Sequence, residues 1–242
     1  MIDLKFLKET LPLKIAVFDE LDSTSLYCKR MLEQNGSCPD LVLANAQSNG
    51  QGRLGKQFFS PASTGLYLTF CFPSEIINCE DLTPRVALAC KNAVEKVFSL
   101  SCGLKWVNDL YLSGRKVGGI LCQNVKKHIL IGIGINVEAP KEIPEDLSAR
   151  FGSLCETCDP RRYSELVISL YQSLLNWQTV PKAVALSAFR NACVHIGKSV
   201  SILADLVAYT GICVGISDDF SIQIEKDGFV KTFSSGFLTI VA

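Results

Sequence analysis

The stretch S-N-G-Q-G-R-L-G-K-Q-F-F, residues 48–59, decides how the rest of the chain is interpreted. Three glycines, two cations and two aromatic residues in so short a segment cannot build a hydrophobic core. They predict a loop whose backbone amides, together with Arg53 and Lys56, meet an anion. Residues 50–55 match G-x-G-x-x-G, but the K-Q-F-F-S-P that follows opens no helix, which excludes a dinucleotide fingerprint. The loop therefore predicts a flap over a ligand.

Length, charge and hydropathy narrow the class of protein. A chain of 242 residues allows one large domain and a small second one. Lys and Arg total 24, as do Asp and Glu, so there is no basic field for nucleic acid and we expect no nucleic-acid partner. No apolar run reaches the roughly 18 residues that span a bilayer, and the N-terminus lacks a signal-peptide core. We expect a cytoplasmic protein with no membrane contact.

The cysteines do not predict a metal site. There are 11 of them, an odd number scattered along the chain, and in a reducing compartment they behave as small buried hydrophobes. Cys155 and Cys158 have C-x-x-C spacing, but a structural zinc site needs two further ligands at comparable spacing. The two histidines, His128 and His195, stand far apart and do not supply those ligands. The C-x-x-C spacing of Cys155 and Cys158 is therefore better explained by chance than by a zinc site. No metal ligands are predicted.

Periodicity predicts a succession of strands and helices up to residue 193. From residue 197 onward, five short alternating strands with an Asp-Gly turn predict a small β-barrel. The expected domains are therefore residues 1–194 and 195–242. The helix over residues 81–100 is expected to start with Thr83 as its N-cap. The other expected elements are strands 13–19, 41–46, 66–72, 104–112, 115–121 and 128–137 and helices 22–35, 164–178 and 182–193.

Three positions are polar where packing alone does not require it. Residues 22–24 offer more hydrogen-bonding groups than one helix cap needs, although capping is the simpler interpretation. Lys105 stands between Leu104 and Trp106 at an inward position, which is costly unless an anion pairs with it. The buried strand 128–137 has glycines where something is expected to approach the backbone closely, and Asn136 near its end is either a turn former or an amide that contacts a base. Taken alone, each signal is modest.

Five motifs in the same order make the chain resemble the biotin–protein ligases over essentially its full length. The family pattern is D-S-T, G-R-G-R-x-G-R, K-W-P-N-D, K-x-x-G-I-L and G-x-G-I-N, followed by an SH3-like barrel. The corresponding segments here are D-S-T at 22–24, G-Q-G-R-L-G-K at 50–56, K-W-V-N-D at 105–109, K-V-G-G-I-L at 116–121 and G-I-G-I-N at 132–136. Gln51 and Val107 depart from the Arg and Pro of that pattern. The resemblance implies an α+β fold in which helices flank a mixed β-sheet, the catalytic fold shared with class II aminoacyl-tRNA synthetases, with a small C-terminal SH3-like β-barrel. The short segment before Asp22 predicts no DNA-binding domain.

The resemblance also assigns roles to residues. Lys105 and Arg53 are implied as catalytic cations. The implied biotin contacts are Ser23, Thr24, Ser25, Gln47, Gly50, Gln51, Gly52, Arg53, Lys105, Gly118 and Gly119. The implied nucleotide contacts are Arg53, Lys56, Phe58, Asn108, Lys116 and Asn136.

The implied reaction is ATP-dependent attachment of biotin, through biotinyl-5′-AMP, to a lysine of a biotin carboxyl carrier protein. Mg²⁺ is expected alongside ATP and biotin. Two alternatives stay open, namely a lipoate–protein ligase and a non-catalytic biotin-binding regulator. The oligomeric state is open too, because a sheet edge that forms a homodimer has the same sequence pattern as any other strand.

Overall fold

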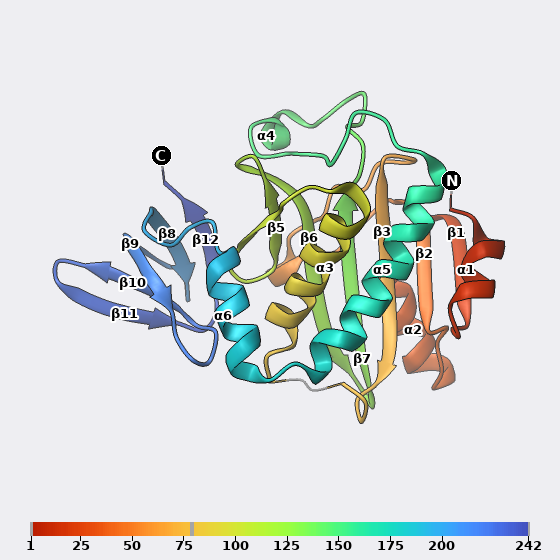
Figure 1. Ribbon diagram of the computed structural model, residues 1–242, viewed down its shortest axis with the longest axis horizontal. Coiled ribbons are helices and arrows are strands. Elements are labelled where there is room, and N and C mark those ends of the chain that lie inside the picture. The colour runs from red at the N-terminus through yellow and green to blue at the C-terminus, as the bar shows by residue number, and fades with distance from the viewer. Residues whose placement is uncertain (1, 78–79, 242) are drawn as a thin grey trace.

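The computed structural model describes residues 2–77 and 80–241, which form two β-sheets with helices around the larger one (Figure 1). The larger sheet has seven strands in the order β1-β2-β3-β7-β6-β5-β4. β1 and β2 are parallel and the other neighbours are antiparallel, which confirms the predicted mixed sheet. The strands are β1 (Ile15–Leu21), β2 (Leu41–Gln47), β3 (Gly65–Pro73), β4 (Gly103–Lys105), β5 (Asp109–Leu112), β6 (Arg115–Val125) and β7 (His128–Asn136).

Helices cover both faces of this sheet because its central strands, β3 and β7, are buried along almost their whole length. The apolar stripes of α3 and α5 pack on one face and form the main core (Figure 1). On the other face, Cys28 and Leu32 of α2 pack with Val42 and Leu130. The helices are α1 (Leu4–Thr10), α2 (Thr24–Asn35), α3 (Leu82–Phe98), α4 (Glu145–Ser148), α5 (Pro160–Thr179) and α6 (Lys182–Ala192).

The ends of α2 confirm the prediction, whereas the start of α3 does not. Ser23 caps α2, and Gly36 ends it in the left-handed conformation with φ of 69°. The expected N-cap Thr83 is wrong, because α3 begins at Leu82 with Asp81 as its N-cap residue. Buried Arg85 explains the shift, since its guanidinium pairs with the Asp81 carboxylate at 2.7 Å and holds it at the helix start.

The predicted strand 104–112 is also wrong, because the chain turns back on itself within it. β4 and β5 pair antiparallel, with Lys105 opposite Asp109, and residues 106–108 form the turn, in which the Trp106–Val107 peptide bond is cis. The turn is held by Asn108, whose side chain donates to the Ile120 carbonyl at 3.0 Å. The backbone carbonyl of Asn108 accepts the Ile120 amide at 2.9 Å.

The C-terminal sheet contains the five predicted strands, in the order β11-β10-β9-β8-β12, and all neighbours are antiparallel. It is joined to the larger sheet by specific contacts. The Trp106 indole donates to the Phe220 carbonyl at 2.8 Å, and the Lys105 ammonium donates to the Leu238 carbonyl at 3.0 Å. The strands are β8 (Ser199–Ala204), β9 (Val207–Ile216), β10 (Ile222–Lys226), β11 (Phe229–Phe233) and β12 (Phe237–Ile240). Within the described residues, no helix is long and apolar enough to cross a membrane.

Candidate active site

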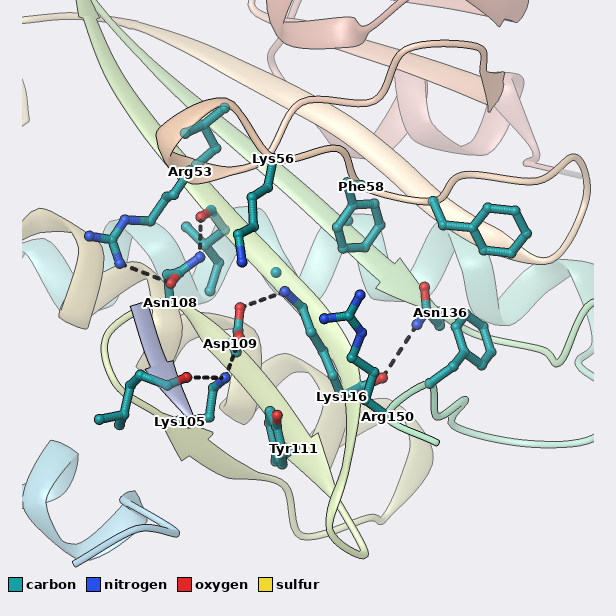
Figure 2. Close-up of a pocket in the computed structure, with 18 of the residues that line it drawn as sticks. Arg53, Lys56, Phe58, Lys105, Asn108, Asp109, Tyr111, Lys116, Asn136 and Arg150 are labelled. Atoms are coloured by element: carbon teal, nitrogen blue, oxygen red, sulfur yellow. Dashed lines mark hydrogen bonds and ion pairs between the residues drawn. The ribbon is translucent and has the colours of Figure 1, made fainter. Parts of the chain in front are cut away.

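A cavity of about 820 Å³ lies between the larger sheet, the loop of residues 48–59 and strand β12 of the C-terminal sheet. Two parts of its lining differ in charge. Hydroxyl and amide side chains from the start of α2 and the end of β2 line one part, which we call the polar floor. Cationic side chains from the loop and from β4 and β6 line another, which we call the cationic end (Figure 2).

The polar floor is a connected hydrogen-bond network. Both the backbone amide and the hydroxyl of Thr24 donate to Gln47 Oε1, at 2.9 and 3.2 Å. Gln47 Nε2 in turn donates to Ser60 Oγ at 2.9 Å. The Thr69 hydroxyl, fully buried on β3, lies 2.9 Å from that of Thr24 and 3.0 Å from that of Ser25. Because these contacts fix the side chains in advance, a ligand loses less free energy to ordering them when it binds.

Glycines on β6 and β7 let side chains approach the sheet closely. A Cβ atom added at Gly132 would lie 2.6 Å from Ser25 Oγ, and one at Gly134 would lie 2.4 Å from the ring of Phe58. Gly119, which pairs with Gly134 across the strands, faces the same ring. The expectation that something approaches the backbone at these glycines is confirmed, and the approaching groups are Ser25 and Phe58.

The glycine-rich loop is a tight hairpin and not an open coil. The Gly52 amide donates to the Lys56 carbonyl at 2.7 Å, and a single 3₁₀ turn, Arg53–Gly55, forms the tip. The tip is tied to the sheet by Arg53, whose guanidinium donates to Asn108 Oδ1 at 3.1 Å (Figure 2). The loop therefore lies over the cavity in this structure, in the place expected of a flap.

At the cationic end, two lysines share one carboxylate. Lys116 Nζ lies 2.6 Å from Asp109 Oδ1, and Lys105 Nζ lies 3.2 Å from Asp109 Oδ2 (Figure 2). Among the described lining residues, Asp109 is the one carboxylate, against six cationic side chains. The excess of positive charge favours an anionic ligand. The six cations are Arg53, Lys56, Lys105, Lys116, Arg150 and Lys198.

Titration properties reflect this arrangement. Burial raises the pKa of the Asp109 carboxyl, but Lys116 and Lys105 together outweigh it and hold that pKa below its usual value. Burial lowers the pKa of the Arg53 guanidinium, and Asp109 opposes the change. His195 is fully buried beneath this end, where burial first, and then the charges of Lys105 and Lys198, lower its pKa to about 4. The positive potential thus extends below the cavity wall.

The structure brings together nearly all residues singled out in the sequence. Gly50 and Gly118 do not line the cavity, since Gly50 packs on the Phe58 carbonyl and Gly118 on that of Gly134. Lys105 does meet an anion, but that anion is Asp109. The residues that do line the cavity are Ser23, Thr24, Ser25, Gln47, Gln51, Gly52, Arg53, Lys56, Phe58, Lys105, Asn108, Lys116, Gly119 and Asn136.

Several lining residues were not singled out. Asp109 stands inside a quoted motif, but its pairing with Lys105 depends on the turn at residues 106–108, which the sequence did not predict. Phe237 and Leu238 of β12 complete the wall from the C-terminal sheet, and Arg150 comes from the segment after α4. None of the five ordered motifs includes these three residues, so only the folded chain shows their role.

The comparisons with known proteins agree with this geometry. A sequence model of the Biotin/lipoate A/B protein ligase family matches residues 17–136. The bifunctional ligase/repressor BirA of Salmonella typhimurium is 28% identical, over 93% of this chain and 74% of its own length. The biotin–[acetyl-CoA-carboxylase] ligase of Mycobacterium tuberculosis is 24% identical, over 81% of this chain and 77% of its own.

A solved structure gives the same result for the fold. The biotin protein ligase from Aquifex aeolicus in complex with biotin and ATP superposes with a TM-score of 0.80 at 27% identity, and the match covers 94% of this chain and 99% of that one. The match includes both sheets. With the motifs in order, the cavity they form and these relatives, the chain belongs to the Biotin/lipoate A/B protein ligase family and, within it, to the biotin–protein ligases.

Proposed function

We propose that the protein attaches biotin to a specific lysine of a biotin carboxyl carrier protein, using ATP and a bound biotinyl-5′-AMP intermediate. The observation that carries the proposal is the division of one cavity into a neutral polar floor and a cationic end. Biotin has the same division, since a polar ureido ring stands at one end and a carboxylate at the other. The ring would bind at Ser23, Thr24 and Gln47, and the carboxylate would point toward Lys105 and Lys116.

The first step joins two anions, and this is where the cations act. The biotin carboxylate oxygen attacks the α-phosphorus of ATP, the bond to the β-phosphate oxygen breaks, and pyrophosphate leaves. Arg53, Lys105 and Lys116 would offset the charge that accumulates as the two anions meet. Because these cations are held by Asp109 and Asn108 before the substrates arrive, little reorganisation is needed during the reaction.

The adenosine would lie beside Phe58 and Asn136. Phe58 packs against Gly119 and Gly134 of the sheet and lines the cavity with its aromatic ring. The Asn136 side chain is held by the Gly152 carbonyl at 3.0 Å and lines the cavity from the end of β7. ATP would bring Mg²⁺ with it. The described residues contain no group of three or more His, Cys, Asp or Glu that could hold a metal, so the phosphates would supply most ligands, and Asp109 is the one carboxylate among the described lining residues.

The second step transfers the acyl group to the carrier protein. Biotinyl-5′-AMP is a mixed anhydride, so the lysine amine attacks its acyl carbon, the bond to the phosphate oxygen breaks, and AMP leaves. Water would compete with the amine, and the loop of residues 48–59 would exclude it. We assign residues 1–194 to the catalytic domain and 195–242 to an SH3-like domain that completes the cavity wall.

The test is biotin-dependent exchange of labelled pyrophosphate into ATP by the purified protein. Exchange with biotin, and its loss in Lys105→Ala, is the expected result. Lipoate and octanoate are assayed in parallel, because the family model covers lipoate ligases too. Exchange with lipoate in place of biotin would assign the other substrate, and biotin binding without exchange would indicate a regulator.

A further inference from the structure

Beside the tip of the glycine-rich loop, a side chain of the loop contacts the C-terminal sheet. Lys56 Nζ lies 4.0 Å from the centroid of the Phe237 ring, well within the range of a cation–π contact. The two residues come from opposite walls of the cavity, since Lys56 follows the loop tip and Phe237 begins β12. This contact joins the flap to a part of the chain that no active-site motif includes.

Phe237 stands on a rigid support. Its neighbour Leu238 is buried and accepts a hydrogen bond from the Lys105 ammonium at 3.0 Å. On the other side, Gly236 packs so closely that an added Cβ would lie 2.8 Å from the Ile202 side chain. The backbone that carries the ring is therefore held against β4 and the rest of the cationic end independently of the loop.

The loop tip, by contrast, has few contacts that would hold it down. Leu54 at its apex is 63% exposed and packs on no core cluster. The contact of Arg53 with Asn108 holds one side of the tip to the larger sheet. The contact of Lys56 with Phe237 holds the other side to the C-terminal sheet.

An aromatic ring is suited to this position for an electrostatic reason. A carboxylate would hold Lys56 more strongly, but it would cancel the charge that the cavity needs for an anionic ligand. The quadrupole of a ring attracts the ammonium and leaves its full charge available on the open side. Lys56 can thus be positioned by Phe237 and face a phosphate at the same time.

We infer that Phe237 is a positioning residue that clasps the closed loop through Lys56 and so slows the loss of biotinyl-5′-AMP. The effect on the intermediate rests on the proposed function, whereas the clasp itself does not. Loss of the contact should speed opening of the loop by about twofold to tenfold, the range that exposed and partly desolvated cation–π contacts support.

The clasp is tested without any ligand by amide hydrogen exchange in the peptide spanning residues 50–58. We expect faster exchange in Phe237→Leu and Lys56→Met, and exchange like that of the parent protein in Phe237→Trp and Lys56→Arg, which keep a ring and a cation. Phe229→Leu is the matched control, because Phe229 is an exposed ring on β11 of the same sheet. Unchanged exchange in Phe237→Leu would overturn the clasp.

Its consequence is tested by the rate at which labelled biotinyl-5′-AMP leaves the protein in a single-turnover assay. Phe237→Leu and Lys56→Met should each speed release, and the double variant should be no faster than Lys56→Met alone, since Phe237 acts only through Lys56. Effects that multiply in the double variant, or faster loop exchange with unchanged release, would overturn the positioning role. If no adenylate forms in the parent protein, the proposed function fails, and the exchange experiment still decides the clasp.

Discussion

The polar floor and the cationic end lie in one cavity but are built on different principles. In the floor, Thr24, Gln47 and Thr69 satisfy one another through neutral hydrogen bonds. In the cationic end, Asp109 binds both Lys105 and Lys116 yet leaves the lining with an excess of positive charge. The floor, whose polar groups are already hydrogen-bonded, recognises a ligand by its shape and hydrogen bonding. The cationic end, with its excess of positive charge, stabilises negative charge that a ligand brings or develops. The floor should therefore affect substrate binding most, and the cationic end should affect rate most.

The largest expected effect is at the cationic end. Lys105→Ala should lower biotin-dependent pyrophosphate exchange by about 10² to 10³-fold, as removal of one preorganised charge-stabilising group does in other enzymes. The Km for biotin should change much less. Lys182→Ala, which removes an exposed lysine from the start of α6, is the control and should exchange normally. A variant that loses affinity but not rate would contradict the division between the two regions.

In the polar floor we expect a smaller effect on a different quantity. Thr24→Val keeps the side-chain shape but removes the hydroxyl that joins Gln47 to Thr69, so the Km for biotin should rise roughly tenfold with little change in kcat. Thr10→Val removes an exposed hydroxyl that bonds the Phe6 carbonyl and serves as the control. Equal losses in kcat and kcat/Km for Thr24→Val would show that the floor acts in the transition state instead.

His195 offers an internal probe of the positive potential. The chain contains two histidines, so the His195 ring can be followed by NMR titration, and its pKa should lie near 4. Because Lys105 contributes to that lowering, Lys105→Ala should raise the pKa of His195. An unchanged pKa would mean that Lys105 does not contribute to the shift.

The same group makes stability depend on pH. Since the folded-state pKa of about 4 lies below the unfolded value of 6.5, the unfolded chain binds the proton more tightly. The stabilisation is complete above pH 6.5 and is lost as the pH falls toward 4, by about 3 kcal/mol at most. Urea unfolding between these values should show a shallower pH dependence in His195→Gln. A slope equal to that of the parent protein would exclude His195 as its source.

The smallest effect is expected at the loop. Gln51 lines the cavity where the family pattern has Arg, and its side chain bonds the Asn49 carbonyl at 2.8 Å. Gln51→Arg adds a cation to the cavity and should slow the release of biotinyl-5′-AMP by a few-fold, the effect of one partly exposed charge. Leu54→Arg adds the same charge at the exposed tip, outside the lining, and should not change release.

Local pattern was enough to predict much of the fold. Ser23 and Gly36 delimit α2 because capping and left-handed geometry depend on a few neighbouring residues. The glycines of β7 predicted close approach for the same local reason. Pattern failed where a tertiary contact decides. Arg85, which pairs with Asp81 at the start of α3, is itself held by the distant Val180 carbonyl, and Asn108 bends the expected strand by bonding Ile120.

The same distinction holds for the cavity. Thr24, Arg53 and Lys116 could be assigned to the cavity from the sequence, because each lies in one of five motifs that occur in the order of the family pattern. Phe237 and Arg150 could not, because nothing in their own segments distinguishes them from ordinary surface residues. Their place depends on how the C-terminal sheet and the segment after α4 pack against the larger sheet.

The contact of Lys105 with the Leu238 carbonyl bears on whether the product of a truncated gene can be active. A chain cut short before β8 would retain all five motifs by which such enzymes are recognised, yet it would lose the carbonyl that holds a proposed catalytic lysine and the wall that closes its pocket. Trp106, 3% exposed here, would lose the Phe220 carbonyl at the same time. Motif content therefore overstates what a truncated copy of such a gene can do, and the last 44 residues, 199–242, are the ones to check first in an open reading frame.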